Sequence, residues 1–323
     1  MITRNFLKSA ALASSLLLTS LAHAQETVFP PVVKLVVPFA PGASTDVLAR
    51  ALAHQLGPRL GSKVIVENKP GASGMVGATQ VSKAPGDGAT IMFVSVSMLT
   101  AAATMKDPAI DVVDDLQPVA IFGDGPLVVA VKQDSPIKTF KEFVTIARNS
   151  PNELTHGTGG VGTIAHMTGE LMDEMGDAKI RHIPYRGAAP AVTDMLGGRL
   201  DVMFAIKATF GTQVDAGNIR LLAVTSEAPS PEFPNLPTVS SEIPGYDVSL
   251  WTGVFAPTDM PEAMVTKLNQ EINAISHTPA IRELLKRDGA SPVAMSPSEV
   301  KERASTSYKT WKNLATSKNI AFE

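Results

Sequence analysis

Residues 32–57 read VVKLVVPFAPGASTDVLARALAHQLG, and they place a buried strand, a glycine turn and an amphipathic helix in direct succession. The run at 32–40 is apolar and rich in valine, which is typical of a strand covered on both faces. From Val47 onward, apolar side chains recur at helical spacing until Gly57, where we expect the helix to end because Pro58 follows. A strand that leads into a helix in this way predicts an α/β fold with a parallel sheet.

The same alternation continues along the chain. Strands at 63–69 and 89–96 flank a helix at 74–84, which completes a βαβαβ unit with right-handed crossovers. The pattern restarts at 126, and the chain returns through a Pro- and Ser-rich connection at 229–246 to helices near the C-terminus. Two α/β halves predict two lobes around a cleft, which is a favoured place for a small ligand. The further strands are expected at 126–133, 153–157, 179–185, 199–206 and 219–226, and the further helices at 139–149, 163–176, 188–198, 261–277, 279–289 and 297–317.

The N-terminus has the features of a secretory leader. Arg4 and Lys8 precede an apolar run at 10–21, and the A-x-A sequence at 22–24 is typical of a cleavage site. The apolar run is shorter than the roughly 20 residues of a membrane span, although an uncleaved anchor is the alternative. We therefore expect residues 1–24 to be a signal peptide and the remaining chain to be exported, without direct membrane insertion.

Composition excludes several classes of function. The chain has no cysteine, so it has no thiolate metal site, no cysteine nucleophile and no redox pair. Its 28 basic residues are outnumbered by 31 acidic ones, and two of the basic residues lie in the leader. This excess of negative charge argues against nucleic acid or an anionic membrane surface as the general partner.

A glycine-rich loop at 155–166, THGTGGVGTIAH, contains G-x-G-x-x-G at Gly157, Gly159 and Gly162. In a dinucleotide site, an acidic residue at the end of the next strand binds the ribose. Here that strand ends at Tyr185-Arg186 without an acid, so we do not expect a nucleotide or any other cofactor. The helix that begins near Thr163 still presents free backbone N–H groups, which favour an anion.

A second helix start, PFAPGASTD at 38–46, has the same character. Ser44, Thr45 and Asp46 stand where a side chain caps a helix, and capping alone is the alternative to a binding role. A third loop, ENKPGASGMVGA at 67–78, either lines the cleft or is only a tight turn between strand and helix. Neither of the first two loops contains Lys or Arg before the first helical turn, so we expect N–H groups and hydroxyls to bind the anion without a nearby cation.

Seven segments of the chain carry a family resemblance. In order along the chain they resemble the periplasmic substrate-binding proteins of tripartite tricarboxylate transporters, often called the Bug family. The resemblance covers essentially all of the mature chain and implies two Rossmann-like lobes with a hinge and an interlobe cleft, similar to type II periplasmic binding proteins. The segments are VVPFAPGASTDVLARALAHQL, VIVENKPGASGMVGATQVSKAPGDGATIMF, LTHGTGGVGTIAHMTGEL, HIPYRGAAPAVTDMLGGRLDVMF, LLAVTS, NLPTVSSEIPGY and WTGVFAP.

The resemblance also implies which residues bind the ligand, a small carboxylate, before its delivery to two integral-membrane permease subunits. This chain departs from the family pattern at Ala43, where a second glycine is usual, and at Thr163, where serine is common. The residues nominated on the first lobe are Phe39, Ala40, Gly42, Ser44, Thr45 and Asp46, and those on the second are Thr158, Gly159, Gly160, Thr163 and His166.

Further candidates stand at other strand ends. Ser95 and Ser97 follow the strand at 89–96, and Ala205 ends the strand at 199–206, so each either lines the cleft or has a structural role. Arg186 either pairs with a distal carboxylate or is solvated, and Trp251 either packs at the hinge or contacts an aromatic ligand. His166 either contacts the ligand or packs beneath its loop.

The sequence contains no catalytic constellation and no metal-ligand spacing, so we expect neither an enzyme nor a metal site. We predict a monomeric periplasmic solute-binding protein for a dicarboxylate, aliphatic or aromatic such as terephthalate. A ligand sensor that signals to a membrane receptor, or an exported hydrolase, is the alternative. The expected lobes are residues 25–125 with 250–323, and residues 126–249.

Overall fold

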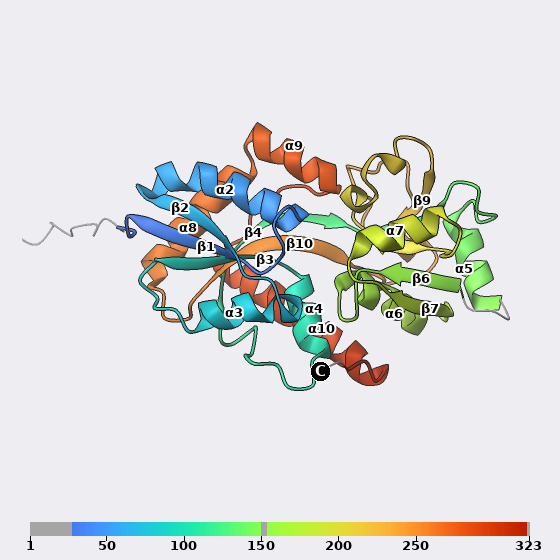
Figure 1. Cartoon of the computed structure of the whole chain (residues 1–323), viewed down its shortest axis with the longest axis horizontal. Helices are drawn as coiled ribbons and strands as arrows, with labels where there is room; N and C mark the ends of the chain where they lie inside the picture. The colour runs from blue at the N-terminus through green and yellow to red at the C-terminus, as the bar shows by residue number, and fades with distance from the viewer. Residues whose placement is uncertain (1–27, 150–153, 322–323) are drawn as a thin grey trace, which may run out of the picture.

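The computed structural model describes residues 28–149 and 154–321. The expected signal peptide, residues 1–24, lies outside the described residues. Figure 1 shows two α/β lobes side by side along the long axis, one with β1, β2 and β3 and the other with β6 and β7. Within the described residues, no helix is both long enough and apolar enough to cross a membrane.

The first lobe contains a five-stranded sheet in the order β2-β1-β3-β10-β4. Strands β1, β2 and β3 are parallel, as the βαβαβ pattern predicts. Strand β10 is antiparallel to both of its neighbours, so the sheet is mixed and the prediction of a parallel sheet holds only for its first three strands. The strands are β1 (Val32–Val37), β2 (Lys63–Asn68), β3 (Thr90–Ser95), β4 (Gln117–Pro126) and β10 (Ser249–Ala256).

The second lobe repeats this arrangement. A parallel bridge between His156 and Val202 joins the pair β6-β7 to the sheet β8-β5-β9, which gives the order β7-β6-β8-β5-β9. Strand β5 is antiparallel to both neighbours and takes the place that β10 has in the first lobe. The strands are β5 (Val128–Lys132), β6 (Leu154–Thr158), β7 (Ile180–Pro184), β8 (Met203–Ala205) and β9 (Ile219–Val224).

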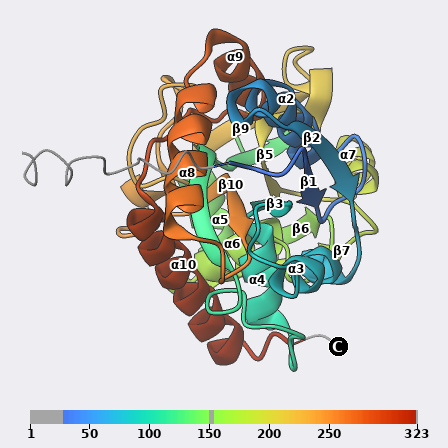
Figure 2. The ribbon, with the colours of Figure 1, turned by 90° about the vertical axis from the view of Figure 1, so that its left-hand side faces the viewer.

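Helices cover both faces of the first sheet, because its central strands carry apolar side chains on both sides. Val33, Leu35 and Val37 of β1 belong to one apolar cluster, and Val36 belongs to another on the opposite face. Figure 2 shows this lobe end-on, with α2 and α9 in the upper part and α3 and α4 in the lower part. The first face packs against α2 (Ser44–Leu60), α8 (Glu262–Ser276) and α9 (Pro279–Asp288), and the second against α3 (Met75–Ser82), α4 (Ser97–Thr104) and α10 (Pro297–Ser317).

The helices of the second lobe are α5 (Phe140–Asn149), α6 (Ile164–Gly176) and α7 (Ala188–Leu196). Short 3₁₀ turns occur at η1 (Ala72–Gly74), η2 (Lys207–Gln213) and η3 (Val239–Ser241). Helix α10 contacts α4 of the first lobe and α6 of the second, and Lys318, just after α10, pairs with Asp173 of α6 at 2.5 Å. The C-terminal segment therefore contacts both lobes.

The end of α2 differs from the sequence prediction. The helix continues through Pro58 to Leu60, so the expected end at Gly57 is wrong. Proline removes one intrahelical hydrogen bond, and a single loss near the end of a helix is tolerated. The helix ends at Gly61, whose φ of 66° is left-handed and whose N–H donates to the carbonyl of Gly57.

Thr225 connects the two chain segments that cross between the lobes. Its hydroxyl accepts from the N–H of Leu127 at 2.9 Å and donates to the carbonyl of Val248 at 2.8 Å. Leu127 lies between β4 and β5, and Val248 precedes β10, so one buried hydroxyl bonds to both crossings. The lobe boundaries at 125/126 and 249/250 stay a prediction.

Replacement of Thr225 by valine tests this connection. Thr225→Val keeps the side-chain volume but leaves the Leu127 N–H and the Val248 carbonyl without their hydroxyl partner in a buried site. We expect a loss of about 1–3 kcal/mol in the free energy of unfolding, measured by urea denaturation. Thr316→Val is the control, because Thr316 is exposed on α10 and its hydroxyl bonds only within that helix. Equal effects of the two substitutions would contradict the role of Thr225.

Candidate functional site

The nominated residues all lie at the carboxyl ends of parallel strands. Residues 39–46 follow β1, Ser95 ends β3 and Ser97 begins α4 just after it, Thr158 ends β6 and residues 159–166 follow it, and Ala205 ends β8. These are the edges at which open α/β sheets bind ligands, because the loops there open onto helix N-termini. The two lobes thus carry candidate residues on matching edges.

In the first loop, residues 38–46, the backbone turns at Gly42. Gly42 has φ of 83°, and Ala43 follows with φ of −64° and ψ of 156°, so Ala43 is the N-cap of α2. Alanine adopts this conformation without strain, which explains why the second glycine of the family pattern is dispensable here. Ser44 begins the helix and no side chain caps it, so capping alone, the alternative for Ser44, Thr45 and Asp46, does not account for these residues.

Asp46 holds this loop from inside. Its carboxylate accepts from the N–H of Gly42 at 2.9 Å, from Nδ2 of Asn68 at 2.8 Å and from Nε of Arg50 at 3.0 Å. Asn68 also donates to the carbonyl of Phe39 at 3.1 Å, so β2 supports the loop as well. Burial acts to raise the pKa of Asp46, but these hydrogen bonds and the charge of Arg50 outweigh it and lower that pKa. An ionised carboxylate whose oxygens are already bonded has no proton for a ligand, which gives Asp46 a positioning role.

The second loop, residues 158–163, repeats the geometry of the first. Gly162 has φ of 75°, and Thr163 follows as the N-cap of α6 with φ of −68° and ψ of 155°. The N–H of Gly162 donates to Nδ1 of His166 at 3.2 Å, four residues further on, as that of Gly42 donates to Asp46. His166 is therefore the counterpart of Asp46 beneath its own loop.

Thr163 and Thr158 fix the remaining backbone of the second loop. The hydroxyl of Thr163 donates to the carbonyl of Gly160 at 2.9 Å and accepts from the N–H of His166 at 3.3 Å. The hydroxyl of Thr158 lies 2.6 Å from Nε2 of His182. In addition, the N–H of Gly187 donates to the carbonyl of Gly159 at 3.2 Å, so the segment after β7 also supports this loop.

His182 is a residue that the sequence analysis did not nominate. Its ring stacks on His166 with 3.8 Å between ring centroids, and burial together with the charge of His166 lowers the pKa of His182 to about 4. Asn68 is its counterpart in the first lobe, since both stand on the second strand of their sheet, beside the strand that enters the loop. The signal available in the sequence was a polar residue within the strand that follows each glycine loop, here Asn68 in β2 and His182 in β7.

A cavity of about 370 Å³ lies between the first loop and the second lobe. Gly42 and Ser44 line it together with Ile206 and residues of η2, so the structure brings the first loop against the second lobe. The second loop does not line this cavity. However, α6, which begins after the second loop, contacts α4, which begins at Ser97.

A cation lines the same cavity, whereas the sequence analysis expected N–H groups and hydroxyls to bind the anion without a nearby cation. Arg287, at the end of α9, lines the cavity beside Asp288. The hydroxyl of Ser44 donates to the carboxylate of Asp288, and burial raises the pKa of Asp288. The sequence did not predict these residues as part of the site, because only the packing of α9 on the first lobe brings residues 287–288 to residues 42–44.

Of the further candidates at strand ends, Ser95 and Ala205 are buried and Arg186 is exposed. Ser95 is buried and pairs with Thr252 in the sheet, and Ala205 is buried and pairs with Val128. Arg186 is exposed in the turn between β7 and α7. The third loop packs against the first, since a Cβ built on Gly77 would lie 2.9 Å from the Cβ of Pro38.

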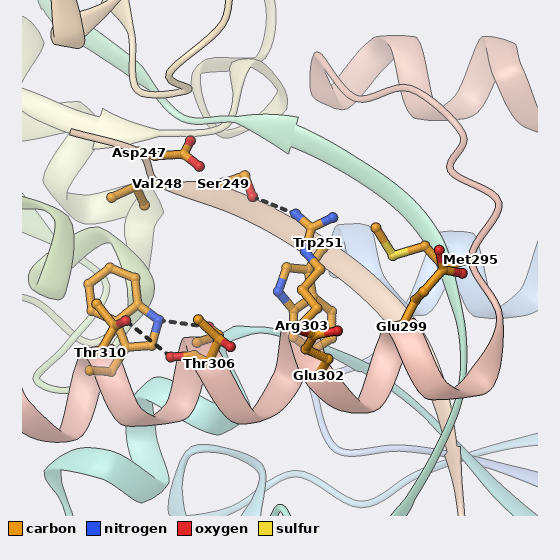
Figure 3. A pocket seen from close by; sticks show the side chains of 12 residues that line it. Asp247, Val248, Ser249, Trp251, Met295, Glu299, Glu302, Arg303, Thr306 and Thr310 are labelled. Carbon is orange, nitrogen blue, oxygen red and sulfur yellow. Dashed lines mark hydrogen bonds between the residues drawn. The ribbon is translucent and has the colours of Figure 1, made fainter. Parts of the chain in front are cut away.

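Trp251 lies near the start of β10, three residues after Val248 of the crossing segment. Its side chain is 2% exposed, stacks on Phe255 and lines a second cavity, of about 440 Å³, beneath α10. Figure 3 shows Trp251 in this cavity near Arg303, whose guanidinium donates to Ser249 at 3.0 Å. Trp251 does not line the cavity that contains Ser44, so its packing at the hinge is the interpretation that the geometry supports.

The part of the chain that the structure describes contains no group of three or more His, Cys, Asp or Glu side chains that could hold a metal ion.

Substitution of Asp46 by asparagine tests its role in the first loop. The introduced amide would turn an N–H donor toward either Gly42 or Asn68, so we expect Asp46→Asn to lower the free energy of unfolding by about 1–3 kcal/mol at neutral pH. The pKa of Asp46 is lowered in the folded state, so its contribution is complete above the unfolded pKa and is lost as the pH falls through the folded pKa. The difference between wild type and variant, measured by urea denaturation, should therefore shrink in acid. Asp134→Asn, at an exposed position, is the control.

Comparison with known proteins gives consistent matches along the chain. Residues 48–320 match the model of the tripartite tricarboxylate transporter family receptor. Protein BugT of Bordetella pertussis is 32% identical over 282 residues, which cover 86% of this chain and 86% of that protein. The structure of R. palustris Rpa4515 with adipate is similar at a TM-score of 0.79 and 30% identity, covering 90% of this chain and 99% of that one. The structure of MatC from Rhodopseudomonas palustris with bound malate is similar at a TM-score of 0.76 and 26% identity, covering 88% of this chain and 99% of that one.

Proposed function

The chain belongs to the tripartite tricarboxylate transporter receptor family, and from that premise we propose that it binds a small dicarboxylate between its two lobes and delivers it to two integral-membrane permease subunits. It is a periplasmic solute-binding protein of the Bug type, and its relatives are solute-binding proteins, not enzymes. The proposal includes export through the signal peptide at 1–24 and action as a monomer.

The paired helix N-termini are the observation that carries the proposal. Within the described residues, the N–H groups of Ser44 and Thr45 have no acceptor in the protein, and neither do those of Ile164 and Ala165 at the equivalent places in α6. Free amides at a helix N-terminus favour an anion through their partial positive charge. One such pair in each lobe supports a ligand with a carboxylate at each end.

Charges near the first loop support the same ligand class. Arg287 supplies a guanidinium that can form a bidentate pair with a carboxylate. Asp288 stands beside it and already accepts from Ser44, so it limits the free positive charge in the cavity. The adipate of Rpa4515 and the malate of MatC are both dicarboxylates, which favours this class over monocarboxylates.

Domain closure follows from the placement of the two loops. A ligand that spans the cleft contacts both lobes only in the closed state, so binding shifts the population toward that state. Affinity near micromolar requires about 8 kcal/mol, which several charge-assisted hydrogen bonds of roughly 1.5–3 kcal/mol each supply after the cost of ordering.

Calorimetry with a panel of acids tests the proposal. The panel contains malate, adipate and terephthalate as dicarboxylates, benzoate and butyrate as monocarboxylates, and benzamide as an uncharged amide. We expect at least one dicarboxylate to bind and the monocarboxylates to bind at least tenfold more weakly, about 1.4 kcal/mol. Binding confined to monocarboxylates or amides would contradict a dicarboxylate as the ligand. Turnover of a bound acid would indicate an enzyme.

A matched pair of glycine variants tests the first loop as part of the site. Gly42 and Gly217 have φ of 83° and 72°, and neither has an atom within 4 Å of a built Cβ. Alanine at either position therefore costs a similar strain of about 1–2 kcal/mol. We expect Gly42→Ala to weaken dicarboxylate binding about tenfold, because the strain displaces the amides of Ser44 and Thr45, whereas Gly217→Ala leaves binding unchanged. Calorimetry and thermal unfolding of both variants separate binding from stability.

A further inference from the structure

We infer that His166 is a positioning residue that holds the second loop in its ligand-binding form only while its imidazole is neutral. The inference rests on the proposed function, since the second loop is the candidate site for one carboxylate of the ligand. The inference makes ligand binding depend on the protonation of His166, which membership of the family does not imply.

The hydrogen bonds around the imidazole fix its tautomer. The N–H of Gly162 donates to Nδ1 at 3.2 Å, so Nδ1 carries a lone pair and not a proton. The proton of neutral His166 therefore resides on Nε2, which faces Oε1 of Glu170 at 3.4 Å. A second proton can bind only at Nδ1, where it would face the N–H of Gly162. Protonation thus removes the hydrogen bond that supports the turn at Gly162.

In the first lobe, the equivalent glycine amide has an acceptor that does not depend on the protonation of a histidine. There a carboxylate, Asp46, accepts from the glycine amide, and its partner four residues on is Arg50. In the second lobe the acceptor is His166, and its partner four residues on is Glu170. The two pairs have reversed charges. A lowered pKa keeps Asp46 ionised, so its carboxylate stays an acceptor, whereas an imidazole that binds a second proton at Nδ1 has no acceptor left for Gly162.

The charged and titratable groups around His166 come from three elements. His182 of β7 stacks on it at 3.8 Å, His156 of β6 lies behind His182, with 6.0 Å between those two ring centroids, and Glu170 lies on its own helix. Burial lowers the pKa of His182 to about 4, so His182 is neutral above that pH, and burial lowers the pKa of His156 well below its usual value.

The other charged groups near the imidazole of His166 are Glu170, Lys318 and Asp173. The hydrogen bond from His166 lowers the pKa of Glu170, and Lys318 lowers it further. Lys318 itself pairs with Asp173, which lies on α6 about two helical turns beyond His166. Helix α4 and strand β8, which also contact α6, contain no charged residue. Glu170 is thus the carboxylate that stabilises a protonated His166.

Two opposing effects decide the direction of the pH dependence. A positive charge on His166 attracts a carboxylate, but Glu170 at 3.4 Å compensates most of that charge locally. The loss of the Gly162 hydrogen bond is not compensated, and it displaces the loop whose amides bind the ligand. Acidification should therefore weaken binding.

Calorimetry with adipate at about pH 8 and about pH 5, the range in which histidine changes charge, tests the inference. The variants are His166→Asn, whose Oδ1 replaces the Nδ1 acceptor and does not titrate, and His166→Leu, which has no acceptor. His54→Asn is the control, because His54 is exposed on α2 and distant from the second loop in sequence and in fold. Adipate itself binds protons in acid, so the informative quantity is the difference between the pH profiles of wild type and His166→Asn.

We expect the affinity of wild type to fall about tenfold more than that of His166→Asn between the two pH values, the effect of one hydrogen bond. His166→Leu should bind weakly at both, and His54→Asn should follow wild type. A wild-type profile parallel to that of His166→Asn, or tighter binding in acid, would overturn the inference.

Nuclear magnetic resonance of the ligand-free protein gives an independent measurement. The imidazole ¹⁵N shifts of His166 should report the Nε2-protonated tautomer at about pH 8, and the amide signal of Gly162 should shift on acidification in wild type but not in His166→Asn. A Gly162 amide that does not respond would overturn the role of His166. A responding amide in a protein that binds none of the carboxylates would overturn the proposed function and support the positioning role.

Discussion

A glycine amide that donates to a side chain four residues further on holds the candidate binding loop of each lobe. This contact requires a left-handed glycine, an extended N-cap and an acceptor on the first turn of the helix, and both lobes meet all three requirements. The next two amides of each helix have no backbone acceptor within the described residues. The sheets, the helix covers and the hinge serve to place these two short loops on matching strand ends.

The sequence predicted the local part of this arrangement and missed the part that depends on packing. Apolar runs and helical spacing indicated β1, α2, β6 and α6, and the resemblance nominated the loops between them. Strand β10 was missed because its pairing joins residues 249–256 to strands more than a hundred residues earlier. No local pattern reports such a pairing.

The supporting residues of the site were missed for the same reason. Asn68 and His182 act from neighbouring strands, and Arg287 and Asp288 come from a helix near the C-terminus. Each is an ordinary polar residue in its own segment, and its role arises from what the fold brings beside it. The helix end at Leu60 was missed because Pro58 lies in the last turn of α2, where the helix continues through it to Leu60.

The crossing at Thr225 has a consequence for ligand selection. If each lobe binds one carboxylate, the distance between the two acid groups is set by how far the lobes rotate toward each other, and not by either loop alone. The segments that permit this rotation converge on one buried hydroxyl. Preference for a shorter or longer diacid can then change through substitutions at the crossing, with every residue that touches the ligand left as it is.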